Sequence, residues 1–382
     1  MKAQSDENGL RLDPVLLGAV LTLVGLGIVM VYSASAFHAH RETGDALFYL
    51  KRHAVAAGLG LVAMLVVARL DYHLLARLAY PLLLVVAVLL AAVLLFGNTA
   101  GGATRWFRFG GFSFQPSEVA KLALIVYLAH SLTRKREKIR SFSFGFLPHV
   151  LMSGALIMLV LVEPDLGTAA IMSLILFALL FVAGTKISYL LLAALAALPL
   201  LYHQVMGTPW RKARILAFLD PEANRLGAGY QLHESLIAFG SGGGSGVGLG
   251  DGKQKLFFLP ASHTDFLFSI LGEEIGFIGA MLVIVLFAVV VWRGLRAALH
   301  APDLFGTYLA LGVSLLIGLQ AVANMSVALG LVPTKGLALP LLSYGGSSLV
   351  ATMAGIGLLF SIGARAQPDL ARRGRKPVGV PA

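Results

Sequence analysis

The segment Pro-Ala-Ser-His-Thr-Asp-Phe at residues 260–266 places a carboxylate, Asp265, at the start of an apolar helical run. The aromatic residues Phe266 and Phe268 follow it. A carboxylate among aromatic rings is poorly hydrated, so burial should raise its pKa, and a carboxylate with a raised pKa is suited to act as a general base. Asp265 could instead cap the helix that follows, although a hydroxyl residue earlier in the segment could cap it equally well.

Two further acidic residues, Glu273 and Glu274, follow Asp265 by eight and nine positions. At about 100° per residue, they lie about 80° and about 180° around the helix from Asp265. They do not share its face. The sequence therefore argues against a glycosidase-like pair of carboxylates on one helix.

Glu118 and Lys121 interrupt another apolar run and are three positions apart, which puts them on one face of a helix. Ionisable residues inside an apolar run are costly, and each is a functional candidate for that reason. Two interpretations stay open for this pair. It is either a buried structural pair in which the charges neutralise each other, or a pair that positions a polar group of a substrate.

A turn and an arginine offer two more sites for charge. Glu163 and Asp165 lie in Glu-Pro-Asp-Leu-Gly-Thr, where proline and glycine predict a tight turn. The two carboxylates could bind a divalent cation, or Asp165 could cap the next helix. Arg105, beside Trp106, has a guanidinium that suits bidentate binding of phosphate, and it equally matches an arginine anchored at the membrane interface.

These residues stand out because charge is scarce in this chain. Of its 382 residues, 58% are hydrophobic and 13% are charged. The mean hydropathy is +0.83, whereas soluble proteins carry about 25% charged residues. The chain has no cysteine, which excludes disulfides, thiolate metal sites and cysteine nucleophiles. It is predicted to be an integral membrane protein.

Apolar runs predict an all-α, polytopic membrane protein with ten transmembrane helices and one large extracytoplasmic loop. Nine runs contain no Asp, Glu, Lys or Arg, namely 14–36, 54–68, 78–104, 141–162, 166–185, 187–210, 275–292, 304–334 and 336–364. A tenth run, at about 115–133, contains Glu118 and Lys121. The large loop spans about 204–264 and includes amphipathic segments at 211–219 and 229–239.

A glycine-rich tract at 240–252 lies in the same loop. It fits neither the P-loop pattern nor the dinucleotide-binding pattern. The tract therefore predicts a turn, at which the backbone can approach a ligand or another helix closely.

The net charge of +11 can be sorted by side of the membrane. Seventeen of the 30 Lys and Arg residues fall in the termini and in the loops on their side, against six in the short loops opposite. The positive-inside rule predicts that both termini are cytoplasmic. Most of the basic excess is then an orientation signal, and no nucleic acid partner is expected. The expected parts are a tail at 1–12, a membrane domain at 13–366 and a basic tail at 367–382.

Six segments, in this order, resemble the SEDS family (shape, elongation, division and sporulation), the family of FtsW, RodA and SpoVE. They are residues 13–36, 101–124, 163–168, 214–250, 253–279 and 340–359. The resemblance covers nearly the whole chain. The segments Lys-Gln-Lys-Leu-Phe-Phe-Leu-Pro and Leu-Ser-Tyr-Gly-Gly-Ser-Ser-Leu look more like the division branch, FtsW, than the elongation branch.

The resemblance implies a peptidoglycan glycosyltransferase that polymerises lipid II on the outer face of the bacterial cytoplasmic membrane. It also implies a class B penicillin-binding transpeptidase as partner, among other membrane proteins of division or elongation. Asp265, in His-Thr-Asp-Phe, is expected to be the catalytic residue. The residues expected to bind lipid II or the departing undecaprenyl pyrophosphate are Arg105, Glu118, Lys121, Asp165, His263, Ser343, Tyr344 and Gly345.

A divalent cation, Mg²⁺ or Mn²⁺, is the one cofactor considered for this chemistry, since no metal-ligand spacing in the chain is specific. Two other function classes stay open. A ten-helix protein could move a lipid-linked sugar across the bilayer, with Glu118 and Lys121 as a polar track. A scaffold that recruits a partner enzyme would not need Asp265. Within the family, an elongation or sporulation role also remains an alternative.

Overall fold

The computed structural model describes residues 12–100, 103–109, 112–221, 223–256 and 258–373. The long helices are α1 (Pro14–Thr43), α2 (Phe48–Arg69), α3 (His73–Phe96), α4 (Pro116–Arg134), α5 (Leu147–Val162), α6 (Leu166–Val182), α7 (Ile187–Met206), α11 (Gly276–Leu299), α12 (Leu304–Ala328) and α13 (Gly346–Arg373). Shorter helices are α8 (Pro209–Leu219), α9 (Tyr230–Gly242) and α10 (Leu267–Glu274), with the turns η1 (Arg136–Lys138) and η2 (Phe142–Phe146).

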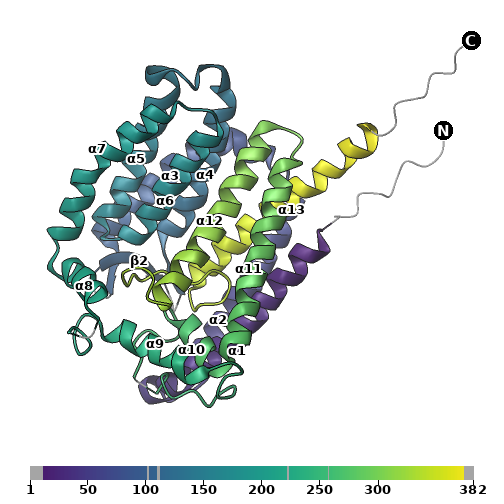
Figure 1. Cartoon of the computed structure of the whole chain (residues 1–382). Coiled ribbons are helices and arrows are strands. Elements are labelled where there is room, and N and C mark those ends of the chain that lie inside the picture. The colour runs from purple at the N-terminus through teal and green to yellow at the C-terminus, as the bar shows by residue number, and fades with distance from the viewer. Residues whose placement is uncertain (1–11, 101–102, 110–111, 222, 257, 374–382) are drawn as a thin grey trace, which may run out of the picture.

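The ten long helices match the ten predicted spans, and the predicted all-helical fold is confirmed. Among the described residues, eight helices are long and apolar enough to cross a membrane, with α5 extended by the turn η2. The other two are α4, which carries the charges Glu118 and Lys121, and α6, which is apolar but has 17 residues. Both lie in the same bundle as the long helices (Figure 1).

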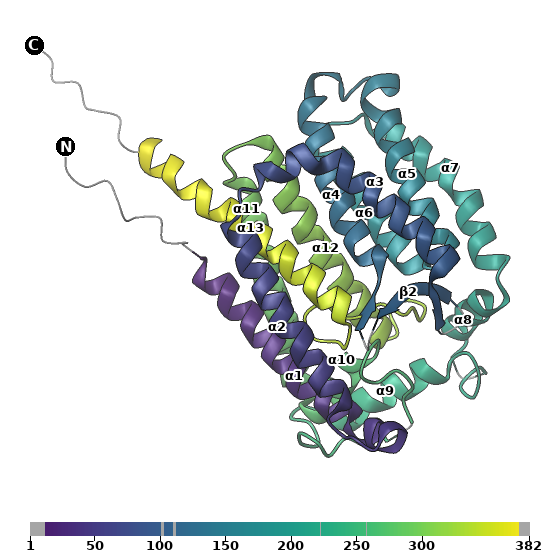
Figure 2. The same cartoon turned by 180° about the vertical axis from the view of Figure 1, so that it is seen from behind.

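Helix α1 shows how the sequence sets these boundaries. Asp13 accepts hydrogen bonds from the backbone N–H groups of Val15 and Leu16, and Pro14 occupies the first helical position. The helix ends where Gly44 adopts the left-handed conformation, with φ of 75°. The start of α1 and the end of α13 lie at the same end of the bundle (Figures 1 and 2). This agrees with an even number of spans.

Three predicted spans were too long, because an apolar loop has the same hydropathy as a helix. The run 78–104 is helical only to Phe96, and three antiparallel strands follow in the order β1 (Asn98–Ala100), β2 (Ala103–Phe109) and β3 (Phe112–Phe114). The run 304–334 is helical only to Ala328. The run 336–364 becomes helical only at Gly346. The loop before it is exposed at Leu331 and buried at Leu339 and Leu342, which are each at most 1% exposed.

Close helix packing depends on small residues on several faces. A Cβ on Gly27 of α1 would lie 2.8 Å from the backbone oxygen of Leu341, and one on Gly357 of α13 would lie 2.5 Å from the backbone oxygen of Met64 in α2. Helices in lipid gain most from such close approach because the bilayer supplies no hydrophobic drive between them. The α1, α2 and α13 group lies side by side in Figure 2.

The glycine tract lets its backbone lie directly against the backbone of another helix. The sequence predicted such a close approach, either to a ligand or to another helix. A Cβ on Gly242 would lie 2.0 Å from the oxygen of Gly272, and one on Gly246, whose φ is 83°, would lie 2.2 Å from that of Glu274. The tract therefore packs on α10. Glu273 accepts hydrogen bonds from the backbone of Lys253, which ties the end of the tract to the same helix.

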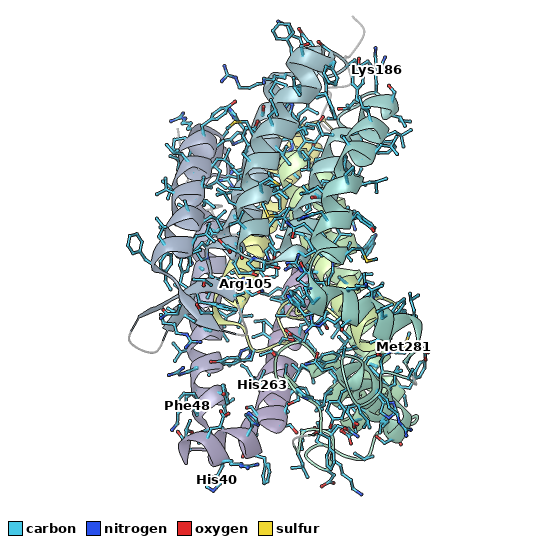
Figure 3. All side chains as sticks on the ribbon, turned by 90° about the vertical axis from the view of Figure 1, so that its left-hand side faces the viewer. His40, Phe48, Arg105, Lys186, His263 and Met281 are labelled. Atoms are coloured by element: carbon cyan, nitrogen blue, oxygen red, sulfur yellow. The ribbon has the colours of Figure 1, made fainter. Side chains whose placement is uncertain are left out.

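The two tails of the predicted domain division fall mostly outside the described residues. Residues 1–11 and 374–382 are not described, and α13 continues to Arg373, past the predicted boundary at 366. In the helical bundle itself, Lys186 lies at one end, and His40 and Phe48 lie at the other (Figure 3). Arg105 and His263 lie between these two ends (Figure 3).

Candidate active site

Asp265 lies in the turn before α10 and does not cap it. The first turn of this helix follows Phe266, and no side chain accepts its N–H groups. The backbone N–H of Asp265 instead donates to the oxygen of Ala261, whose φ is 56°. Phe266 and Phe268 are at most 2% exposed. Burial raises the pKa of Asp265 to about 6, although Arg214 and Arg105 oppose the rise.

Two residues outside the motif hold Asp265 in place. The side-chain NH₂ group of Asn324 in α12 donates to the backbone oxygen of Asp265 at 2.8 Å and to the backbone oxygen of Leu337 at 2.6 Å. Gly336 lies against the carboxylate itself, because a Cβ there would be 2.9 Å from Oδ2 of Asp265. The loop between α12 and α13 thus forms one wall of the site. The carboxylate fits against this loop because position 336 is a glycine.

Arg105 clamps the Glu163–Asp165 turn. Its Nε donates to the oxygen of Glu163 at 2.8 Å and its Nη2 to the oxygen of Pro164 at 2.7 Å, and its Nη1 lies 4.0 Å from Oδ2 of Asp165. Arg211 of α8 also donates to the oxygen of Pro164, at 3.1 Å. Strand β2 and helix α8 therefore meet at this turn. Arg105 lies inside the protein, with its side chain 18% exposed.

Two further basic groups, Arg214 and Lys335, complete a cationic cluster around the turn. Arg214 makes a long contact of 3.5 Å to the oxygen of Thr334, next to Lys335. Burial lowers the pKa of Arg214, with Asp265 opposing. Burial also lowers the pKa of Lys335, with Asp165 opposing. The nearby charge of Arg211 adds to the lowering for Lys335.

The acidic residues of the turn have different roles. Asp165 accepts from both the backbone N–H and the hydroxyl of Thr168, at 3.0 and 2.9 Å, so it caps α6. The carboxyl of Glu163 is fully buried and has no hydrogen-bond partner among the described residues. Burial and the nearby Asp165 raise the pKa of Glu163 to about 8. Glu163 is therefore mostly neutral at pH 7.

The charge of the site follows from this inventory. Four basic side chains, those of Arg105, Arg211, Arg214 and Lys335, lie around two carboxyl groups, those of Asp165 and Asp265. The excess is positive, and the guanidinium groups are suited to oxygen anions such as phosphate. The site can thus hold an anionic group beside a basic carboxylate.

A metal centre is not formed by these side chains. Across the described residues, no group of three or more His, Cys, Asp or Glu side chains lies close enough to hold an ion. Of the two carboxylates in the turn, Glu163 is inaccessible and both oxygens of Asp165 accept hydrogen bonds from Thr168. The residues present do not fit a resident divalent cation.

Glu118 and Lys121 form a closed pair in α4. The Nζ of Lys121 donates to Oε1 of Glu118 at 2.9 Å, and the side chains are 1% and 10% exposed. Within the described part of the chain, neither side chain hydrogen-bonds to another site residue. The geometry is that of a buried structural pair, the first of the two interpretations from the sequence.

The remaining predicted residues are His263, two positions before Asp265, and Ser343, Tyr344 and Gly345 in the turn before α13. The ring of His263 lies 4.7 Å from that of Tyr49 and 5.8 Å from that of Tyr344. Its backbone oxygen accepts from the N–H of Tyr344 at 3.0 Å. Burial lowers the pKa of His263 to about 4, so the ring is neutral at pH 7. His263 holds the motif against the turn before α13 and does not bond to Asp265 through its ring.

That turn is shaped by its own polar groups. Ser343 accepts from the backbone N–H of Leu339 at 3.0 Å, and the oxygen of Gly345 accepts from Leu349 in the first turn of α13. Ser343 is 3% exposed. Ser343, Tyr344 and Gly345 therefore position the wall of the site.

Five residues of the site were not found from the sequence: Arg211, Arg214, Asn324, Lys335 and Gly336. Three of them left a signal. Arg211 and Arg214 are three positions apart beside Trp210, and their guanidiniums lie 5.0 and 5.2 Å from its ring. Lys335 is the single charge between two apolar runs. Asn324 and Gly336 left none, since nothing local distinguishes them.

Comparison with known proteins identifies the family. The family model described as cell cycle protein, that of FtsW, RodA and SpoVE, matches residues 14–367. The chain belongs to this family. A probable peptidoglycan glycosyltransferase FtsW of Geobacter metallireducens is 46% identical over 93% of this chain and 95% of its own length. The stage V sporulation protein E of Bacillus subtilis is 40% identical over 92% of this chain and 96% of its own.

Solved structures of this family have the same fold. A chain from a study of a peptidoglycan synthase complex that coordinates polymerization and crosslinking is 34% identical, with a TM-score of 0.79, over 94% of this chain and 99% of its own length. The rod shape determining protein RodA of Thermus thermophilus is 33% identical, with a TM-score of 0.69, over 93% of this chain and 98% of its own. The predicted family membership and multi-pass membrane architecture are confirmed.

Proposed function

We propose that this chain polymerises lipid II with Asp265 as the general base. It is a membrane-embedded peptidoglycan glycosyltransferase, the class to which its FtsW relatives are assigned by name. The observation that carries the assignment of the base is the partly exposed carboxylate of Asp265, whose pKa is raised to about 6, beside a cluster of four basic side chains. At pH 7 about nine-tenths of such a carboxylate is ionised and ready to accept a proton.

The reaction joins two lipid-linked disaccharides. The 4-hydroxyl oxygen of the acceptor sugar attacks the anomeric carbon of the donor, and the bond from that carbon to the pyrophosphate oxygen breaks. Asp265 takes the proton of the hydroxyl as the new glycosidic bond forms. The electron pair of the broken bond leaves with undecaprenyl pyrophosphate.

The departing pyrophosphate needs positive charge, which the cationic cluster supplies. Arg105 is fixed by its bonds to the Glu163–Asp165 turn, and Arg211 is fixed by the same turn. Charges held rigidly where negative charge develops stabilise a transition state more than mobile ones, because they need no reorganisation. Arg214 lies near Asp265 and Lys335 lies near Asp165, and both add positive charge to the site.

A divalent cation remains a proposal that the sequence raised. Since the described side chains offer no ligand set, no step above depends on Mg²⁺ or Mn²⁺. Polymerisation in excess chelator tests it. Activity lost in chelator and restored by either ion supports a cation that enters with the substrate, and undiminished activity removes it from the mechanism.

The orientation, compartment and partner belong to the same proposal. We place the site on the outer face of the cytoplasmic membrane, because the basic loops gather at the opposite end. A class B penicillin-binding transpeptidase is the proposed partner, supported by the similarity to a peptidoglycan synthase complex. A role in division, supported by the FtsW relatives, is tested by rescue of a strain depleted of its division polymerase.

The deciding experiment gives labelled lipid II to the purified full chain with its transpeptidase partner. The native chain should make glycan polymer and Asp265→Ala should make none. Transport of lipid II in liposomes, with no polymer from either protein, would instead favour the flippase hypothesis. The closed Glu118–Lys121 pair gives that hypothesis little support, since its charges satisfy each other.

A further inference from the structure

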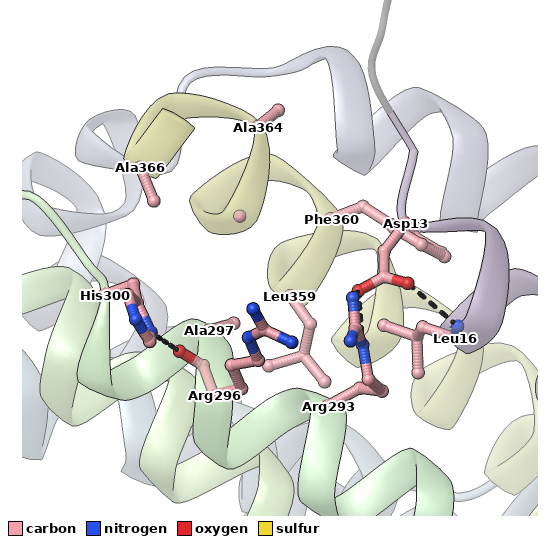
Figure 4. A pocket seen from close by; sticks show the side chains of 11 residues that line it. Asp13, Leu16, Arg293, Arg296, Ala297, His300, Leu359, Phe360, Ala364 and Ala366 are labelled. Carbon is pink, nitrogen blue, oxygen red and sulfur yellow. Dashed lines mark hydrogen bonds and ion pairs between the residues drawn. The ribbon is translucent and has the colours of Figure 1, made fainter. Parts of the chain in front are cut away.

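A pocket lies at the opposite end of the bundle from the active site, between α1, α11 and α13. Its volume is about 150 Å³, the room of about five water molecules. The side chains that line it come from the first turn of α1, the last turns of α11 and the middle of α13 (Figure 4). About 20 residues of α11 separate it from α10, a distance of about 30 Å along the helix. It cannot take part in the chemistry at Asp265.

One helix face supplies the basic groups of this pocket. Arg293, Arg296 and His300 follow each other at helical spacing along α11 (Figure 4). Arg293 pairs with Asp13, which also caps α1. Nδ1 of His300 lies 2.8 Å from the backbone oxygen of Arg296. These two side chains are therefore held in place.

Arg296 is the group without a counter-ion. Within the described part of the chain, its guanidinium makes no hydrogen bond and no ion pair, and the residue is exposed. Asp13 is already paired with Arg293, so among the described residues the positive charge of Arg296 has no counter-ion. A guanidinium beside a concave surface is suited to bidentate binding of a phosphate group.

The other walls of the pocket are apolar. Leu16, Leu359 and Phe360 line it and are each at most 2% exposed. Outside it, the same end of α11 presents Trp292 and Leu299, which are 56% and 82% exposed. An exposed tryptophan and leucine beside arginines are typical of the boundary between lipid tails and headgroups. A ligand here meets both a cation and hydrocarbon.

We infer that this pocket binds the phosphate of an anionic phospholipid, with Arg296 as its main contact and with the acyl chains beside the exposed Trp292 and Leu299 at the same end of α11. Basic pockets between transmembrane helices recognise lipid headgroups in this way. A soluble phosphate would use Arg296 alike but would gain nothing from the exposed Trp292 and Leu299. These two exposed apolar residues are the reason for assigning a lipid.

The test is native mass spectrometry of the full chain in detergent with an equal mixture of phosphatidylglycerol and phosphatidylcholine. The native protein should retain phosphatidylglycerol preferentially. Arg296→Gln should bind it about tenfold more weakly, as expected for the loss of one charge-assisted hydrogen bond. Arg140→Gln is the matched control, since it removes the same charge from an exposed site on the same predicted side. It should bind phosphatidylglycerol like the native chain.

A second variant separates the pocket from general charge effects. Ala297→Phe fills the space between Arg293 and Arg296 and leaves the charge unchanged, so it should also lose the lipid. Melting temperatures in phosphatidylcholine alone identify a variant that is merely misfolded, in which case the other variant decides. Equal lipid retention by a folded variant and the native chain overturns the proposal. Displacement of the lipid by excess inorganic phosphate also overturns it, because the site would then recognise free phosphate.

Discussion

At the scale of single residues, Asp265 combines two properties that rarely coexist. It is a partly exposed carboxylate in a poorly hydrated position, and it lies near Arg214 and Arg105, whose charges oppose the rise of its pKa. Those cations limit the rise that burial causes, so the carboxyl is mostly ionised at pH 7. Without burial it would be too weak a base to accept a hydroxyl proton. The balance at about 6 serves the proposed reaction.

The first prediction concerns pH. The rate of polymerisation should rise through about pH 6 as Asp265 ionises, then level off. Asp265→Asn should abolish polymer at every pH, whereas Glu163→Gln, the same change in a carboxyl that is already neutral at pH 7, should keep near-native activity there. Rates with labelled lipid II from pH 5 to 8 check both. Loss of activity in Glu163→Gln at pH 7 would contradict the assigned roles.

The stability of the same variant follows from linkage. The folded pKa of Asp265 lies above its ordinary value of 3.8, so folding binds a proton. The protein therefore loses stability as pH rises from 3.8 through about 6, and at pH 7 the ionised group is a net cost of at most a few kcal/mol. Asp265→Asn should melt at the same temperature as the native chain or higher. A lower melting temperature would mean that the carboxylate is structural.

Gly336 offers a residue-scale prediction without any change of charge. Gly336→Ala places a methyl group 2.9 Å from Oδ2 of Asp265, closer than carbon and oxygen tolerate. The carboxylate must move, so the turnover rate should fall by about tenfold to a hundredfold, since catalysis is sensitive to displacements of about 1 Å. The control is Gly58→Ala in α2, where no atom lies within 4 Å of the added Cβ. Equal rates for the two variants would contradict this placement.

At the scale of elements, a strand, a short helix and a loop bring the cationic residues to the site. Strand β2 brings Arg105, helix α8 brings Arg211 and Arg214, and the loop after α12 brings Lys335 and Gly336. None of these is a transmembrane helix. The spans hold the three elements at fixed separations, and the Glu163–Asp165 turn joins two of them through backbone oxygens.

The buried pair Glu118–Lys121 should stabilise helix α4 within the bundle. Glu118→Gln leaves Lys121 buried at 1% exposure with no opposite charge, so the yield of folded protein should drop. Removing one partner of a buried pair costs about 3 to 5 kcal/mol, whereas replacing both is often neutral. The double variant Glu118→Gln with Lys121→Met should therefore recover the yield. Normal yield with lost polymerisation in Glu118→Gln would assign the pair to the substrate instead. Size-exclusion profiles of purified variants measure the yield.

At the scale of the whole molecule, the active site and the inferred lipid pocket lie toward opposite ends of the bundle. The end with the basic loops carries the lipid-phosphate pocket that we infer, and the active site is set back from the other end (Figure 3). Such a division suits an enzyme whose substrate is held by a lipid tail and whose product grows away from the membrane.

Orientation gives the last prediction. The chain has no cysteine, so single substitutions can be labelled without background. In intact cells, a membrane-impermeant maleimide should label Arg225→Cys in the large loop and should not label Lys138→Cys between α4 and α5, although both residues are exposed. Both should react after the membrane is permeabilised. The reverse pattern in intact cells would invert the topology.

The sequence by itself determined the membrane class, the ten helices and the family, and it predicted Asp265 as the catalytic residue, because hydropathy, charge and short motifs are local properties of the chain. Three spans were overextended for the same reason, since a loop such as 329–345 is as apolar as a helix. Tertiary structure alone decided what surrounds Asp265. The contacts of Asn324 and Gly336 join segments 59 and 71 positions away in the chain, and no local pattern encodes which side chain meets a carboxylate at that separation.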